Sequence, residues 1–401
     1  MCAFGACAHI KYLVALFWKI CYTITDHMVK GVNENMAVLF SFGWDKEELW
    51  RMNLRKMTIP LLAGFVLFSC AACGSGKKST NLQAGMDYIE SAEYDNALTC
   101  FDAGEAAGED RELLYRAKGI AYIGKMQYGD AVDAFLAALS CCDGTLTSLE
   151  YDINYYLATA YYKGGDYLSA FDTYSAILAL KPKEAQAYYL RGISAISMGY
   201  HDQAVSDFDR AVSLNKDNYS MYIDIYLILD KYGFSQEGQT YLENAMSAGS
   251  RSMSDYEKGR ICYYMGDYEN ACTYLDNANK ANTNETIVLE LGKAYEATGD
   301  VNFAASIYVN YLSNYGESAA IYNQLGNCKL ATGDYQAALD AIASGIAMNN
   351  MDVMQTLKYN EIVAYEYMGD FKKACVLMEN YLAAYPDDER AQREYEFLRT
   401  R

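Results

Sequence analysis

Few residues beyond Cys73 have the chemistry of an active site. The one histidine in that part of the chain is His201, which lies next to Asp202 in a predicted turn. A Ser-His-Asp or Cys-His device needs a histidine base that a third group holds in place. We interpret His201 as a solvated turn residue, and the nearby pair Asp207 and Asp209 as helix-surface charges. No catalytic residue is expected, and the chain is not predicted to be an enzyme.

The cysteines beyond Cys73 do not have the spacing of a metal site. They form no C-x-x-C pair and have no histidine partner, so neither zinc nor any other metal is expected. Most occupy apolar helix positions, where cysteine packs as a small core residue. The adjacent pair Cys141 and Cys142 is the exposed candidate for oxidation, because disulfides are permitted outside the cytoplasm. These cysteines are Cys100, Cys141, Cys142, Cys262, Cys272, Cys328 and Cys375.

The composition excludes several classes of function. The formal net charge is −19 and no run of Lys and Arg forms a basic stripe, so a nucleic-acid partner is not expected. With 52% apolar residues and 3 prolines in the chain, disorder is not expected. Tyrosine is the outlier, with 39 residues. The sequence from Gly74 to Thr80 looks superficially like a phosphate-binding loop, but no strand precedes it and no cofactor is expected.

Residues 52–73 have the pattern of a secretion signal. Arg55 and Lys56 follow Met52, and residues 58–73 are apolar and uncharged. This apolar stretch is shorter than the roughly 20 residues that span a bilayer. The sequence Cys70-Ala-Ala-Cys73-Gly resembles the lipobox of bacterial lipoproteins, although that family prefers Leu where Cys70 stands. The resemblance implies acylation of the Cys73 sulfur, with Cys70 as the alternative site, and anchoring at the extracytoplasmic face of a cell membrane.

Two alternatives to this interpretation remain. The segment is an ordinary cleaved signal or a short uncleaved anchor if neither cysteine is acylated. Residues 1–51 are expected to be an upstream extension absent from the native protein, with translation starting at Met52, because Lys46-Glu47-Glu48 can be encoded by a purine-rich ribosome-binding sequence. The competing interpretation is a genuine apolar segment from Tyr12 to Tyr22. Residues 74–81, rich in Gly and Ser, are predicted to be a flexible tether.

A period of about 34 residues runs through the rest of the chain. A small residue followed three positions later by an aromatic one recurs, as in Gly119 and Tyr122. After it comes a Gly-Asp-aromatic-x-x-Ala turn, as at Gly165 to Ala170. Such a period predicts a stack of supersecondary units rather than a globule with one cleft.

The pattern resembles the tetratricopeptide repeat (TPR) family. The resemblance implies an all-α fold, an α-solenoid of about nine helix-turn-helix units over residues 82–386 in a right-handed superhelix, with a capping helix over 387–401. The nine units are keyed by the small residue of the first helix and the alanine position of the second, and these pairs are Gly85/Ala97, Gly119/Ala131, Ala158/Ala170, Gly192/Ala204, Tyr226/Gly238, Gly259/Ala271, Gly292/Ala304, Gly326/Ala338 and Ile362/Ala374.

Each recurring position has a physical role in the expected helix pair. Small residues such as Gly192 and Ala204 let two helix backbones approach, and glycines such as Gly165 end the first helix in a left-handed conformation. The Asp that follows can cap the second helix. The fifth unit departs from the pattern at Tyr226 and Gly238, which marks either a loosened joint or, as we favour, a divergent repeat. A large apolar residue of each second helix is expected to fill the groove: Phe101, Phe135, Tyr174, Phe208, Tyr308, Ile342 and Met378.

The resemblance also implies a binding surface. First helices of the family line the inner, concave wall, where tyrosine offers contact area and a hydroxyl for peptide recognition, although part of the tyrosine excess is expected to serve packing between helices. Asn327 and Asn360 stand where one subtype grips a carboxylate, but Asn323 replaces its first Lys, so such a clamp is not expected. The predicted site is Tyr155, Tyr156, Tyr162, Tyr189, Tyr256, Tyr263, Tyr264, Asn323, Gln324, Asn327, Tyr359, Asn360 and Tyr367.

The sequence therefore predicts a lipid-anchored scaffold that binds a protein or peptide in an envelope or secretion-related assembly. One alternative is a solute- or glycan-binding lipoprotein, although no tryptophan, the usual sugar platform, occurs beyond Trp50. The other is a cytoplasmic adaptor, which applies if the signal is not used.

Overall fold

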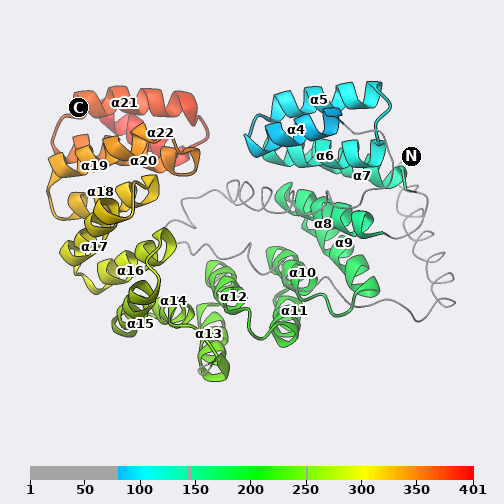
Figure 1. Ribbon diagram of the computed structural model, residues 1–401, viewed down its shortest axis with the longest axis horizontal. Helices are drawn as coiled ribbons and strands as arrows, with labels where there is room; N and C mark the ends of the chain where they lie inside the picture. Colours follow the sequence, from blue (N-terminus) through cyan, green and yellow to red (C-terminus); the bar gives the residue numbers. More distant parts are fainter. Residues whose placement is uncertain (1–79, 143–146, 250–251) are drawn as a thin grey trace. The chain divides into compact units, whose positions relative to one another are not determined.

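The computed structural model describes residues 80–142, 147–249 and 252–401, and every regular element in these ranges is an α-helix (Figure 1). The predicted signal, Cys70, Cys73 and most of the predicted tether lie outside these residues. The helices are α4 (Thr80–Glu90), α5 (Tyr94–Ala106), α6 (Arg111–Gly124), α7 (Tyr128–Ser140), α8 (Ser148–Lys163), α9 (Tyr167–Leu180), α10 (Ala185–Ser197), α11 (His201–Leu214), α12 (Tyr219–Lys231), α13 (Ser235–Gly249), α14 (Asp255–Tyr264), α15 (Tyr268–Ala281), α16 (Glu285–Thr298), α17 (Val301–Asn314), α18 (Ala319–Ala331), α19 (Tyr335–Ala347), α20 (Met351–Tyr367), α21 (Phe371–Ala384) and α22 (Glu389–Leu398).

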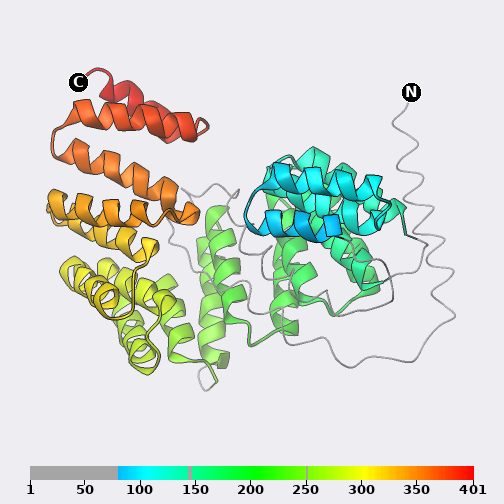
Figure 2. The same cartoon turned by 45° about the horizontal axis from the view of Figure 1, so that its top comes forward.

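These helices form consecutive pairs, and each helix packs against the next one along the chain (Figures 1 and 2). The pairs run from α4/α5 to α20/α21, and α22 follows them as the predicted cap. First helices of several successive pairs also contact each other, as α4 does with α6 and α18 with α20. The predicted α-solenoid is confirmed. Among the described residues, no helix combines the length and the apolar character that crossing a membrane requires.

The turn inside each pair follows the predicted chemistry. Gly165 has φ +85° and Gly333 has φ +79°, the left-handed conformation that glycine adopts without a steric penalty. The Asp166 carboxylate then accepts a hydrogen bond from the Ser169 backbone N–H at 3.1 Å, which caps the second helix. The first two units use Ala92 and Met126 at the glycine position, with φ +58° and +62°, so these turns carry a steric cost that the others avoid.

The key glycines make room for a ring of their own unit. A Cβ atom added to Gly292 would lie 2.2 Å from the Tyr308 ring, and one added to Gly192 would lie 2.6 Å from the Phe208 ring. Both rings are fully buried. The predicted groove-filling residues are therefore buried as expected. The two helices of one pair approach each other closely where these residues lie.

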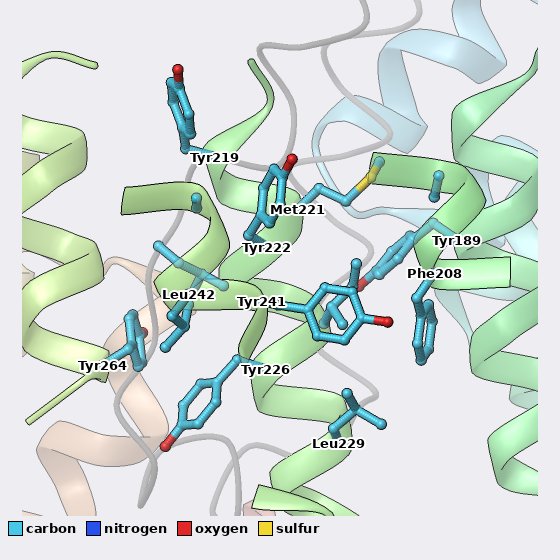
Figure 3. Packing of buried hydrophobic residues seen from close by; sticks show 14 of the residues in the cluster. Tyr189, Phe208, Tyr219, Met221, Tyr222, Tyr226, Leu229, Tyr241, Leu242 and Tyr264 are labelled. Carbon is cyan, nitrogen blue, oxygen red and sulfur yellow. The ribbon is translucent and has the colours of Figure 1, made fainter. Parts of the chain in front are cut away.

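The fifth unit exchanges the large and small residues of this arrangement. Gly238 of α13 leaves room for Tyr226 of α12, because a Cβ on Gly238 would lie 3.1 Å from the Tyr226 ring. The two helices thus stay closely packed, as expected for a divergent repeat. Toward the neighbouring units, the backbones of α11 and α12 approach at few points, as do those of α13 and α14. A core rich in buried tyrosines joins this unit to its neighbours, and Figure 3 shows Tyr189, Tyr222, Tyr226, Tyr241 and Tyr264 within it.

Candidate functional site

The predicted site residues all lie on first helices of the pairs. They belong to α8, α10, α14, α18 and α20, and we call the surface that the first helices share the first-helix wall. Of the predicted tyrosines, only Tyr367 is exposed, with 63% of its surface accessible. Tyr189, Tyr264 and Tyr359 are buried, and the other tyrosines are half-buried. The wall is therefore a packed surface in which rings also join neighbouring helices.

The part of the wall on α8 combines packing with an unused hydroxyl group. Tyr155 meets the ring of Tyr174 edge-on at 6.1 Å, and Tyr156 stacks on Phe135 at 5.8 Å. The Tyr155 hydroxyl is buried and has no hydrogen-bond partner among the described residues. Burial also raises the pKa of Tyr155. A neutral, partnerless hydroxyl can donate a hydrogen bond to an incoming acceptor.

A chain of hydroxyl groups then links three first helices. Tyr162 of α8 lies 3.3 Å from the Ser197 hydroxyl of α10, and the same Ser197 oxygen lies 2.8 Å from the hydroxyl of Tyr232, which follows α12. These contacts join residues about one repeat apart in sequence. Tyr162 therefore connects neighbouring units in addition to facing the wall.

The middle of the wall holds charged groups that the sequence did not single out. Arg260 of α14 is 3% exposed, and its Nη1 donates to the Ser220 hydroxyl of α12 at 3.1 Å. The Arg260 Nε atom and the Tyr256 hydroxyl have no hydrogen-bond partner within the described part of the chain. Glu290 of α16 is 4% exposed, and half-buried Asp224 lies on α12. Burial raises the pKa of Asp224 to about 7, although the positive charge of Arg260 opposes the shift.

Repeat register could have indicated these residues. Arg260 directly follows the key residue Gly259, while Asp224 and Glu290 each precede their key residue by two positions. Asn327 and Asn360 occupy the corresponding places in later units, so these two positions supply polar side chains in several units.

Amide side chains form a connected hydrogen-bond network near the end of the wall. Asn360 Nδ2 donates to Asn323 Oδ1 at 2.9 Å and to Asn327 Oδ1 at 2.8 Å. Asn327 Nδ2 in turn donates to Gln324 Oε1 at 3.1 Å. The structure thus brings these four predicted residues together, and part of their hydrogen-bonding capacity is already used within the wall.

The last unit presents a carboxyl group beside the capping helix. Arg390 of α22 lies over the Tyr359 ring at 4.7 Å. Glu366 of α20 has one buried carboxyl oxygen with no partner among the described residues. Burial, together with the negative charge of Glu394, raises the pKa of Glu366 to about 7. Exposed Tyr367, the next residue, stacks on Tyr335 at 5.5 Å.

Two interpretations from the sequence are corrected by the structure. His201 is not a solvated turn residue: it begins α11, its side chain is 28% exposed, and its Nε2 lies 2.6 Å from the Glu237 carboxylate of the next unit. Asp207 is not a surface charge, because it is buried and accepts two hydrogen bonds from Arg191, at 2.8 and 2.7 Å. The His201 contact joins neighbouring units, and the Arg191–Asp207 contact joins the two helices of one unit.

The adjacent cysteines have ordinary hydrogen-bonded surroundings. The Cys142 thiol donates to Glu112 at 3.4 Å, and burial with this contact raises its pKa to about 12, which leaves little reactive thiolate. Glu150 lies close to Cys142 and Glu112, and one possible metal-ligand atom of each of the three residues lies within 4.8 Å of the others. The Glu150 carboxylate, however, already caps α8 through Thr147. Cys141 is exposed and remains the better candidate for oxidation.

Removing the unused hydroxyl of Tyr155 should stabilise the protein, and Tyr241→Phe is the matched control. Tyr155→Phe removes a buried group without a partner, so the free energy of unfolding is expected to rise by about 1 kcal/mol. Tyr241→Phe makes the same chemical change but removes a hydroxyl that donates to Asp209 at 2.9 Å, and a loss of about 1 kcal/mol is expected. Urea unfolding of both variants measures the difference. A loss in Tyr155→Phe as large as in Tyr241→Phe would contradict the assignment of the unused hydroxyl.

Comparison with known proteins finds similarity to repeat proteins over parts of the chain. Sequence models of the tetratricopeptide repeat match residues 185–218, 256–285, 289–350 and 359–388. A TPR repeat-containing protein of Methanocaldococcus jannaschii is 22% identical over 245 residues, which are 58% of this chain and 42% of that protein. BBSome complex member BBS4 of Bos taurus is 26% identical over 154 residues, which are 38% of this chain and 28% of that protein. The chain thus spans less than half the length of these curated relatives.

Solved structures match this chain at low sequence identity. A tetratricopeptide repeat protein from Parabacteroides merdae is 16% identical, with a TM-score of 0.41, and the match covers 70% of this chain and 97% of that one. MamA from Desulfovibrio magneticus RS-1 is 16% identical, with a TM-score of 0.38, and the match covers 45% of this chain and all of that one (100%).

Proposed function

We propose that this chain, whose solenoid contains tetratricopeptide repeats, is a scaffold that binds an extended segment of a partner protein along the first-helix wall. Proteins built from these repeats generally mediate protein–protein interactions. A partner in an envelope or secretion-related assembly fits the predicted secretion signal. The strongly acidic composition of the chain favours a basic or neutral partner.

The observation that carries this proposal is the series of buried polar atoms without partners on first helices. They are the Tyr155 hydroxyl on α8, Gln186 Nε2 on α10, the Tyr256 hydroxyl and Arg260 Nε on α14, and Glu366 Oε1 on α20. A buried polar atom without a partner costs stability. A polypeptide main chain supplies both N–H and C=O groups at regular intervals, so a bound segment would satisfy such atoms along several units.

A photo-crosslinking experiment tests the position of the partner. We expect a benzoylphenylalanine in place of Tyr367, which is exposed on α20, to crosslink a defined partner in intact cells. The same substitution at Tyr315, which is also exposed but follows second helix α17, serves as the control. Equal crosslinking from both positions would argue against binding along the first-helix wall.

We further propose that acyl chains on Cys73 hold the scaffold at the extracytoplasmic face of a cell membrane. Support comes from the apolar segment that ends at Cys73 and the Gly-Ser-Gly stretch after it. A single acyl chain binds membranes marginally, whereas two or more anchor a protein stably. In the alternative, without acylation, the same wall would serve a cytoplasmic adaptor.

Metabolic labelling with palmitate tests the anchor. The full chain is expected to take up label in a bacterium that processes lipoproteins, Cys73→Ser should lose it, and Cys70→Ser should retain it. Absence of label from the unaltered chain would exclude the anchor, and loss only in Cys70→Ser would move it to Cys70. Neither result affects the crosslinking test of the first-helix wall.

A further inference from the structure

The middle of the first-helix wall gathers one guanidinium, two carboxyl groups and several aromatic rings. Arg260 and Glu290 are almost fully buried, and Asp224 is half-buried. Tyr256 lies beside the Arg260 guanidinium, 5.7 Å from ring centre to Cζ. These side chains come from α12, α14 and α16, three successive first helices, so the group exists only when the fifth, sixth and seventh units are stacked.

The charges in this group do not cancel. With both carboxyl groups ionised, Asp224 and Glu290 carry two negative charges against the single positive charge of Arg260. Burial makes such an excess expensive, and a buried charge is normally paired. Burial therefore resists the ionisation of Asp224, whose pKa is raised to about 7. A second cation at this place would restore neutrality and favour the ionised carboxylate.

The surrounding rings also suit a cation. The charge of Asp224 acts on the hydroxyls of Tyr189 on α10 and Tyr264 on α14, and Figure 3 shows these two rings in the core that also holds Tyr222 and Tyr226 of α12. Aromatic faces attract Lys, Arg and other cations by about 0.5 to 2 kcal/mol in many proteins. A carboxylate beside tyrosine rings is thus a recognisable receptor for a basic side chain.

We propose that Asp224, Glu290 and the adjoining tyrosines bind a Lys or Arg side chain of the partner segment. The proposal rests on the proposed function and names the chemistry of its partner. Two further donors, the Arg260 Nε and the Tyr256 hydroxyl, are buried in the same group and lack partners among the described residues. Both can donate to a carbonyl oxygen of the partner, which would fix the register of its basic residue.

An acidic side chain is the competing occupant, and the charges disfavour it. It could accept from Arg260, but it would place a third carboxylate beside Asp224 and Glu290. Arg260 Nη1 is already engaged with Ser220, so the bidentate pairing that makes Arg–carboxylate contacts strong would compete with that bond.

A phage-displayed library of random ten-residue peptides tests the proposal. The library is panned on the purified full chain in non-ionic detergent, in parallel with Asp224→Asn and Glu269→Gln. The last variant removes an equal charge from an exposed position on second helix α15, so it controls for general attraction of basic peptides to an acidic protein. We expect peptides selected by the unaltered chain to be at least fivefold enriched in Lys or Arg at one position. That enrichment should persist in Glu269→Gln and disappear in Asp224→Asn.

The other outcomes separate the two proposals. Selection of peptides with no basic preference, with acidic residues, or with the same basic preference in Asp224→Asn would overturn the inference and leave the scaffold function standing. Failure to select any peptide, with crosslinking from Tyr367 also lost, would overturn both. Circular dichroism of Asp224→Asn verifies that its helices are intact, and direct titration of a selected peptide against Asp224→Glu, which keeps the charge, should show most of the affinity restored.

Discussion

Gly292→Ala is expected to lower the free energy of unfolding by about 3 kcal/mol, the upper part of the range for overpacked cores. The new Cβ would lie 2.2 Å from both Cζ and the hydroxyl oxygen of Tyr308. The Tyr308 ring cannot move aside easily, because it is fully buried and its hydroxyl donates to Glu296 Oε1 at 2.8 Å. The helices α16 and α17 would have to separate. Urea unfolding followed by circular dichroism measures the loss.

Gly129→Ala is the matched control for this substitution. Gly129 lies in the first turn of α7, where an added Cβ meets no atom within 4 Å. Alanine is the better helix former, so this variant should gain up to about 1 kcal/mol. Because a solenoid is stabilised by interfaces between neighbours, hydrogen exchange should place the damage of Gly292→Ala in α16, α17 and the adjoining helices. Similar stabilities for the two variants would contradict the close-packing argument.

Asp224→Asn is expected to stabilise the free protein at pH 8 by about 2 kcal/mol. The pKa of Asp224 is raised from 3.8 to about 7 in the folded chain. The folded state therefore holds this proton more tightly than the unfolded state, and the contribution of Asp224 to stability falls as pH rises from about 4 through 7. A shift of one pKa unit corresponds to 1.36 kcal/mol, and we discount the full value because Asp224 is partly exposed.

The decisive measurement is how the difference in unfolding free energy between Asp224→Asn and the unaltered chain changes with pH. Urea unfolding at pH 5 and pH 8 should show a gain for Asp224→Asn that grows with pH. Other groups with raised pKa values, such as Glu366 and His201, are present in both proteins and drop out of the comparison. An equal or lower stability of the variant at pH 8 would show that Asp224 is well stabilised in the free chain. Higher stability together with lost selection of basic peptides would identify a residue kept for binding at the expense of stability.

The helix pairs were predictable because they depend on local chemistry. Gly165 and Asp166 act within one turn, and Phe208 packs on Gly192 sixteen residues away in the same unit. Such contacts recur with the repeat, so a periodic sequence displays them several times. The exchange of roles between Tyr226 and Gly238 was visible in the same way.

The contacts between units, including those of the first-helix wall, were less predictable because they depend on how neighbouring units stack. His201 reaches Glu237 only through the stacking of the fourth unit on the fifth. The Asn360 network likewise needs the register of α18 against α20. Which tyrosine hydroxyl finds a partner depends on a side-chain rotamer and on one neighbouring atom, and Tyr155 and Tyr241 have the same residue type with opposite outcomes. Repeat position indicates which side chains face the wall, but not which of their atoms remain unused.

The tyrosine-rich junctions around the fifth unit have a consequence for mechanical load. Here α12 and α13 meet their neighbours through side chains, several of them tyrosine rings, and the backbones approach at few points. Ring contacts act over a short range and lose their attraction once the rings separate by an ångström or so. A chain held at one end and pulled at the other by a captured partner would yield first at this joint, while the tightly interlocked units on either side keep their structure.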